Sequence, residues 1–99
     1  MAGYLLTAAA EEDLAEIVRF IAQSDGVGRA SHVLEAFLEA FDTLTFTPGM
    51  GYRREHLTGA TLRWWPVLRF QVLYDPETDP LTVMRIVHGA RDLDRIFGA

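Results

Sequence analysis

The chain of 99 residues contains no cysteine and no lysine, and it has no long apolar run. Without cysteine, neither a disulfide framework nor a thiolate metal site is available. No apolar run approaches the ~20 residues of a membrane-spanning helix, and the first residues lack the pattern of a signal peptide. We therefore expect a soluble, cytoplasmic protein that does not interact with membranes.

All nine basic residues are arginine, which a GC-rich genome explains most simply. The formal net charge is −5, and it is divided unevenly. Residues 1–50 carry two arginines against eight carboxylates, a net charge of −6, whereas residues 51–99 carry seven arginines against six carboxylates, a net charge of +1. Nonspecific nucleic-acid binding needs a dense cationic surface. The acidic balance therefore argues against direct nucleic-acid binding, and leaves room only for a local arginine cluster in the second half.

The stretch from Leu62 to Phe97 organises the predicted sheet. Two runs of β-branched and aromatic residues are separated by the Asp- and Pro-rich residues 75–80, which predicts a β-hairpin. In the first run Phe70, Val72 and Tyr74 alternate with Arg69, Gln71 and Leu73, the period of a half-buried strand. The second run, residues 81–87, alternates less and predicts a central strand buried on both faces. Gly89 permits a change of direction, and residues 91–97 are predicted to form a short helix.

The first half predicts two helices. Residues 4–6 can form a first strand, and Thr7 is a plausible N-cap for a helix over residues 8–24. Residues 25–28 predict a turn, and residues 29–45 a second helix antiparallel to the first. Each helix has one apolar stripe. The stripes consist of Leu14, Ile17, Val18 and Ile21, and of Ala30, Val33, Leu34, Phe37, Phe41 and Leu44.

Residues 47–51 end the second helix, because Pro48 cannot continue it and the glycines reverse the chain. A loop over residues 52–60 and a short strand over 61–65 follow, with Pro66 at the turn into the long strand. The predicted order is β-α-α-β-β-β-α. The fold class is therefore α+β, with a helical hairpin packed on a small, mainly antiparallel sheet, in a single domain of residues 1–99.

No metal or cofactor site is indicated. His32, His56 and His88 lack the close spacing of zinc ligands. Gly49-x-Gly51 lacks the lysine and the strand-loop-helix context of a phosphate loop, and a role as a loop breaker is sufficient for it. Ser24 and Ser31 have no recognisable His–carboxylate partners.

The arginines of the second half are the more interesting set. Several of Arg53, Arg54, Arg63, Arg69, Arg85 and Arg91 can converge on one face and grip phosphates or carboxylates. Arg85 lies within an apolar strand, which is costly unless the residue is paired or functional. The alternative to function is an internal ion pair with Asp13, Glu16 or Asp92. Trp64 and Trp65 are adjacent in a strand and point to opposite faces, so we expect one in the core and the other available to a partner.

Four motifs follow one another in a familiar order. They are Thr-x-x-Ala-Glu-Glu-Asp-Leu at residues 7–14, Phe-x-Pro-x-Met-Gly at 46–51, Leu-Arg-x-x-Pro-Val-x-Arg-Phe-x-Val-x-Tyr at 62–74, and Arg-Ile-Val-His-Gly-Ala-Arg-Asp-Leu at 85–93. Together they resemble the ParE branch of the RelE/ParE toxin superfamily over nearly the whole chain. The last motif is the most specific of the four.

The resemblance implies the toxin half of a bacterial toxin–antitoxin pair. The expected partner is an antitoxin with a ribbon-helix-helix DNA-binding domain and a flexible tail that wraps the toxin. ParE-type toxins poison DNA gyrase, whereas RelE-type toxins cut mRNA in the ribosome. RelE-like enzymes use Lys and Arg around the phosphate and often a terminal Tyr for acid–base work. Here lysine is absent, and Phe97 stands where that Tyr would fall.

The leading hypothesis is therefore a toxin that binds gyrase without catalysis, so no catalytic residue is expected. If the protein is instead a nuclease, its site would use Arg63, Arg69, Arg85 and His88. A third hypothesis is a toxin-fold protein that has lost toxicity and only binds an antitoxin. For the gyrase surface we expect Arg63, Trp65, Arg91, Arg95 and Phe97. For the antitoxin tail, as a helix or an added strand, we expect a groove lined by exposed members of Leu14, Ile17, Phe20, Val33 and Phe37; each of these can also be plain core.

Overall fold

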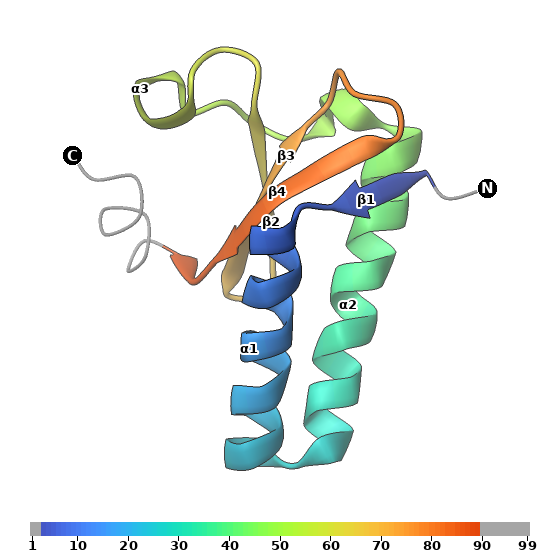
Figure 1. The fold of residues 1–99 in the computed structure, drawn as a ribbon, viewed down its shortest axis with the longest axis vertical. Helices are drawn as coiled ribbons and strands as arrows, with labels where there is room; N and C mark the ends of the chain where they lie inside the picture. The colour runs from blue at the N-terminus through green and yellow to red at the C-terminus, as the bar shows by residue number, and fades with distance from the viewer. Residues whose placement is uncertain (1–2, 90–99) are drawn as a thin grey trace.

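The structure is a computed structural model that describes residues 3–89 (Figure 1). A short strand is followed by two long helices, two short helices and three more strands. The elements are β1 (Tyr4–Leu6), α1 (Ala8–Asp25), α2 (Val27–Phe46), the 3₁₀ helix η1 (Pro48–Met50), α3 (Glu55–Thr58), β2 (Arg63–Val67), β3 (Phe70–Asp75) and β4 (Leu81–Val87). This confirms the α+β class; the helix predicted over residues 91–97 lies outside the described residues.

The four strands form one mixed sheet in the order β1-β4-β3-β2. β1 pairs with β4 in parallel, and the other two pairings are antiparallel. β4 is central, as predicted. β3 is also central, and the prediction that it is half-buried is wrong, because Leu73 on its second face is only 3% exposed. Leu73 clusters there with Trp64 of β2 and Val87 of β4, and Leu57 and Leu62 pack against this cluster, so part of the second face is covered as well.

The two long helices lie side by side and antiparallel against one face of the sheet (Figure 1). Thr7 caps α1 as predicted: its hydroxyl accepts the Ala10 N–H at 3.0 Å. The link between the helices is a single residue, Gly26, whose φ of 95° is one that other residues rarely adopt. So short a connection forces the helices into an antiparallel hairpin.

The main core lies between this hairpin and the sheet. Its centre consists of fully buried aromatic and β-branched side chains from α2, β3 and β4, namely Phe37, Phe41, Val72, Tyr74 and Val83. A smaller cluster of Trp64, Leu73 and Val87 lies on the opposite face, packed against Leu57 of α3 and Leu62 just before β2. Trp64 and Trp65 therefore do point to opposite faces. Trp65 is half-buried and packs on the main core.

The turn between β2 and β3 does not fall at Pro66, as predicted, but at Leu68 and Arg69. Pro66 lies inside β2 and pairs with Gln71. β2 is an edge strand, and an edge position tolerates proline because the missing N–H faces away from the ladder. Leu68 turns the chain with a φ of 56°, an uncommon conformation for a residue other than glycine.

A bulge changes the direction of the side chains in β4. Leu73 pairs with Arg85 whereas Tyr74 pairs with Val83, so Met84 is an extra residue opposite β3. The Thr7 hydroxyl donates to the Met84 carbonyl at 2.8 Å, which satisfies the carbonyl of that extra residue. Within residues 3–89, no helix combines the length and the apolar character needed to cross a membrane.

Candidate functional site

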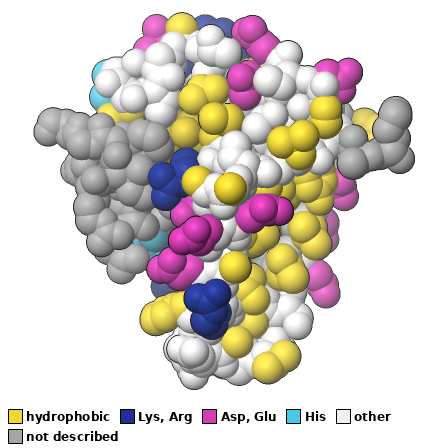
Figure 2. Space-filling model, in the orientation of Figure 1, with side chains coloured by type: hydrophobic (Ala, Val, Ile, Leu, Met, Phe, Trp, Pro, Cys, Tyr) yellow, Lys and Arg dark blue, Asp and Glu magenta, His cyan; other side chains and the backbone are white. Residues whose placement is uncertain are grey.

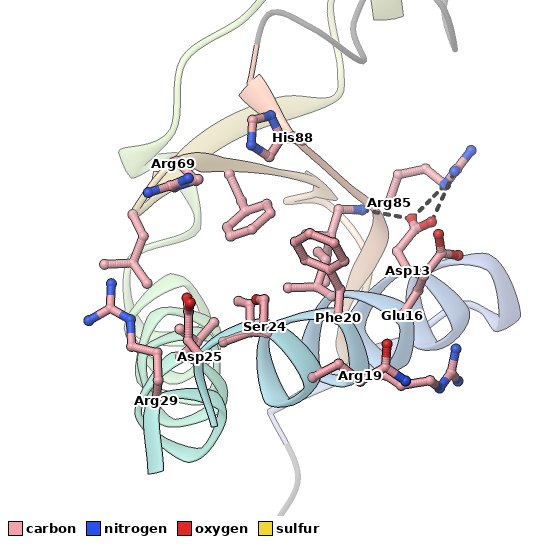
Figure 3. A pocket seen from close by; sticks show the side chains of 17 residues that line it. Asp13, Glu16, Arg19, Phe20, Ser24, Asp25, Arg29, Arg69, Arg85 and His88 are labelled. Carbon is pink, nitrogen blue, oxygen red and sulfur yellow. Dashed lines mark hydrogen bonds and ion pairs between the residues drawn. The ribbon is translucent and has the colours of Figure 1, made fainter. Parts of the chain in front are cut away.

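A hollow, which we call the groove, lies between α1, the start of α2, the β2–β3 turn and the end of β4 (Figure 3). Its volume is about 840 Å³. Its lining consists of Asp13, Glu16, Ile17, Arg19, Phe20, Ile21, Gln23, Ser24, Asp25, Arg29, Val33, Leu68, Arg69, Phe70, Arg85, Ile86 and His88. Segments from both ends of the sequence therefore build one concave surface.

The floor of the groove is core, while its rim is apolar and open to solvent. Val33 and Phe70 are 2% and 7% exposed, whereas Phe20 and Leu68 are 68% and 55% exposed. Two large apolar side chains left in water beside a hollow are typical of a surface that a partner covers. Figure 2 shows further apolar side chains interspersed with charged ones over the two helices.

Asp13 and Arg85 form the ion pair at one end of the groove (Figure 3). Arg85 donates two hydrogen bonds to Asp13, from Nε to Oδ2 at 2.7 Å and from Nη2 to Oδ1 at 3.1 Å. Oδ2 also accepts the Ile86 N–H at 3.0 Å. The hydrogen bond to Asp13 raises the pKa of Arg85. Of the partners considered for Arg85, Asp13 pairs with it, whereas Asp92 lies outside the described residues.

The opposite end of the groove is cationic. Arg29 from α2 and Arg69 from the β2–β3 turn lie on that side in Figure 3, with Asp25 near Arg29. All three are exposed. Asp13 and Arg85 form the sole ion pair within residues 3–89, so neither Arg29 nor Arg69 has a carboxylate partner among them.

His88 lies above the groove where β4 ends. Its ring packs edge-on against Phe70, with the ring centres 5.3 Å apart and the planes at 90°. The side chain is half-buried. The contact with Phe70 positions the His88 ring at the end of β4, in the lining of the groove.

The residues predicted for the nuclease alternative do not all meet. Arg69, Arg85 and His88 line the groove, but Arg63 is not among the lining residues. Instead Arg63 donates to the Gly51 carbonyl at 2.7 Å and supports the loop after η1. The same loop is held by Tyr74, whose hydroxyl donates to the Pro48 carbonyl at 2.6 Å and accepts the Gly51 N–H at 2.8 Å.

The residues predicted for the antitoxin separate into two groups. Ile17, Phe20 and Val33 line the groove. Leu14 is half-buried against the main core, and Phe37 is 0% exposed at its centre. Phe37 has no surface to offer a partner unless the core opens.

The residues predicted for the gyrase surface are described only in part. Arg63 and Trp65 share one face of β2, two residues apart, and both are half-buried. Trp65 lines a shallow hollow together with Ala36, Ala40 and Pro66. Arg91, Arg95 and Phe97 lie outside the described residues.

Sequence reasoning missed Leu68, Arg29 and the exposed side of the β2–β3 turn. The sequence pattern assigned Leu68 to a strand, whereas it lies in the β2–β3 turn, which exposes its side chain. Phe20 carried a usable signal, because it lies outside the α1 stripe of Leu14, Ile17 and Ile21. Within residues 3–89, no three His, Asp or Glu side chains gather as metal ligands would.

Comparisons with known proteins agree with this architecture. The family model described as "ParE toxin of type II toxin-antitoxin system, parDE" matches residues 4–93. A solved structure described as "Chromosomal ParDE TA system from P. aeruginosa" superposes with a TM-score of 0.73 and 17% sequence identity, and the match covers 87% of this chain and 94% of that chain. At that identity the likeness concerns the fold. No curated protein sequence matches the chain.

Proposed function

The chain belongs to the ParE toxin family of type II toxin–antitoxin systems, and from this membership we propose that it is a toxin that binds DNA gyrase and is neutralised by a cognate antitoxin. Residues 1–99 form one toxin domain in this proposal, acting in the bacterial cytoplasm without a cofactor. The observation that carries it is the family match over residues 4–93.

The groove supports the antitoxin part of the proposal. A tail that is disordered alone can gain binding energy by covering exposed apolar side chains, and Phe20 and Leu68 are two such side chains on the groove's rim. Ile17 and Val33 lie below them in the lining. We place the antitoxin tail, a segment attached to a ribbon-helix-helix domain, on this surface.

The paired state of Arg85 supports binding rather than catalysis. An RNA-cleaving site needs a base for the 2′-hydroxyl, cations for the phosphate and an acid for the leaving oxygen. The Asp13 carboxylate already engages Arg85 at 2.7 Å, which neutralises the charge that a phosphate would use. We place the gyrase contact on β2, around Arg63 and Trp65, and on the C-terminal residues Arg91, Arg95 and Phe97.

One observation favours a second candidate, the ribosome-dependent nuclease. Arg69, Arg85 and His88 come from separate positions in the chain and line one hollow. Two cations beside an imidazole are a chemically sensible set for phosphate and proton transfer. This candidate needs Arg85 to leave Asp13, and it needs His88 to act as the general acid or base.

A paired assay tests the proposal. The toxin is induced in cells without an antitoxin, and mRNA cleavage is followed by primer extension while the purified protein is added to a gyrase supercoiling reaction. Inhibited supercoiling or trapped DNA cleavage with intact mRNA is the expected result. Cuts in mRNA that require the ribosome, with gyrase unaffected, would establish the nuclease instead.

The antitoxin part is tested separately. The product of the reading frame adjacent to the toxin gene is co-expressed with the toxin, and growth and co-purification are measured. Restored growth with a stable complex is expected. A stable complex from a protein that arrests no growth, inhibits no gyrase and cuts no mRNA would mean a relic that only binds antitoxin.

A further inference from the structure

We propose that Arg54 is the centre of the toxin's contact with its target, and that its guanidinium group binds a carboxylate on the surface of gyrase. This inference rests on the proposed function and adds to it the chemistry of the contact. The observation that carries it is an arginine packed on two aromatic rings, whose charge no carboxylate of residues 3–89 neutralises. Arg54 lies near the start of β2, at the opposite end of that strand from the β2–β3 turn and the groove (Figure 1).

The Arg54 side chain is held in place by its aromatic neighbours. Cζ, the central carbon of its guanidinium group, lies 5.1 Å from the centre of the Tyr52 ring and 6.0 Å from that of the Trp64 ring. Nη2 donates to the Tyr52 hydroxyl at 3.1 Å, and that hydroxyl donates to Gln71 Oε1 at 2.7 Å. A guanidinium group fixed in this way loses little conformational entropy when an acceptor binds to it.

The backbone of Arg54 is fixed as well. Its carbonyl accepts the N–H groups of Leu57 and Thr58 at 2.9 and 3.0 Å, so Arg54 caps the start of the short helix α3. Tyr52, two residues earlier, exchanges two backbone hydrogen bonds with Trp64, which ties the loop to β2. The loop therefore presents Arg54 beside β2, the strand on which we place the gyrase contact.

The guanidinium group has hydrogen-bonding capacity that residues 3–89 do not use. Nε is buried and donates to no acceptor among these residues, and Nη1, which solvent reaches, donates to none of them either. The ion pair within this part of the chain is that of Asp13 and Arg85. Arg63 differs from Arg54, because it donates to the Gly51 carbonyl at 2.7 Å and so positions the loop. Arg54 is thus fixed in place without an anionic partner among the described residues.

The surrounding charge favours a single carboxylate over a nucleic acid. The chain carries a formal net charge of −5, and residues 53–55 contribute two arginines and one glutamate, a net charge of +1. A polyanion needs a dense cationic surface, which this loop does not provide. The Tyr52 side chain beside Arg54 is 38% exposed. An arginine next to exposed aromatic surface is typical of the centre of a protein interface, where Arg, Tyr and Trp dominate the binding energy.

The test measures the Kd of the full-length toxin for purified gyrase holoenzyme, with and without bound DNA, by biolayer interferometry. Arg54→Gln removes the charge and the planar fork. Arg53→Gln is the matched control, since Arg53 is an exposed arginine one position away that makes no hydrogen bond or ring contact within residues 3–89. We expect Arg54→Gln to raise the Kd at least about tenfold, with a matching loss of supercoiling inhibition, and Arg53→Gln to raise the Kd less than about threefold.

Two further variants separate a lost contact from damage to the loop. Arg54→Lys keeps the charge but has no fork, so it should lose most of the affinity that Arg54→Gln loses. Tyr52→Phe keeps the ring and removes the hydroxyl that fixes Nη2, and it should raise the Kd about two- to fivefold. Circular dichroism melts of both should stay within about 3 °C of wild type. A Kd that rises only in variants with a lowered Tm would count against the contact.

Three other outcomes are decisive. Equal Kd values for Arg54→Gln and Arg53→Gln would overturn the assignment while leaving gyrase binding intact. An Arg54 dependence confined to gyrase that holds DNA, or seen with a single-stranded oligonucleotide alone, would overturn it as well, because the ligand would then be a phosphate. A wild-type toxin that neither binds gyrase nor inhibits supercoiling would refute the proposed function and this inference with it, which differs from unchanged binding by Arg54→Gln.

Discussion

Replacing Asp13 tests whether the ion pair with Arg85 joins α1 to the sheet. The Asp13 side chain is 17% exposed and accepts three hydrogen bonds, two from Arg85 and one from the Ile86 N–H. Asp13→Ala removes all three and leaves the guanidinium, 31% exposed, without its partner. Hydrogen bonds to charged groups contribute about 1.5–3 kcal/mol, and partial hydration of Arg85 offsets part of the loss. We expect the free energy of unfolding to fall by about 2–3 kcal/mol and the Tm by about 10 °C or more.

The assay is urea unfolding followed by circular dichroism, with the double-mutant cycle of Asp13→Ala and Arg85→Ala. Glu16→Ala is the matched control, since Glu16 lies one turn along the same helix, is exposed and carries the same charge. It should change stability by no more than about 0.5 kcal/mol. Asp13→Asn keeps an oxygen acceptor and should fall between the two. A loss for Asp13→Ala equal to that for Glu16→Ala, or a coupling energy below about 0.5 kcal/mol, would refute the reasoning.

Three further predictions concern the loop after η1, which Tyr74 holds, and His88 at the end of β4. Burial raises the pKa of Tyr74 above its ordinary value of 10.0, so its stabilising contribution is complete below about pH 10 and is lost as the pH rises further. Tyr74→Phe should lower stability by about 1–3 kcal/mol at pH 7 and flatten the alkaline decline in urea titrations, whereas an unchanged alkaline slope would count against this assignment. Gly51→Ala places a Cβ 2.5 Å from the Tyr74 hydroxyl oxygen and 2.7 Å from the Trp64 carbonyl oxygen, so the free energy of unfolding should fall by about 1–3 kcal/mol. Gly49→Ala is the control, because its Cβ meets nothing within 4 Å and the free energy of unfolding should not change. His88→Ala should leave growth arrest intact if the toxin acts by binding; loss of arrest with an unchanged Tm would support the nuclease.

The elements could be predicted because their signals are local. Thr7 caps α1, the stripe containing Phe37 and Phe41 faces the core, and the Asp75 side chain accepts the Glu77 N–H at 2.9 Å in the predicted turn. Each signal involves residues only a few positions apart. The errors also have a local cause. Pro66 was assigned to a turn because its neighbouring residues do not show that β2 is an edge strand, where proline is tolerated.

The groove could not be predicted in the same way. The sequence indicated an apolar surface on the helices and a set of arginines, but not which arginines meet. Arg29 and Arg69 reach one end of the groove because the single-residue link at Gly26 and the turn at Leu68 bring distant segments together. Leu68 is exposed and Phe37 is buried for the same reason, since burial depends on what packs above a residue and not on its own type.

Arg85 shows where the limit lies. Its position in an apolar strand was enough to predict that it is either paired or functional, because burying an unpaired charge is costly whatever the fold. Asp13, Glu16 and Asp92 were equal candidates, since sequence spacing alone sets no distance between α1 and β4. The bulge at Met84 and the packing of α1 across β4 bring Asp13 within 2.7 Å of Arg85. The sequence by itself thus determined the elements and the need for a partner, through local periodicity and the cost of burying charge; the identity of that partner, and the groove beside it, depended on strand register and helix packing, which only the tertiary structure decides.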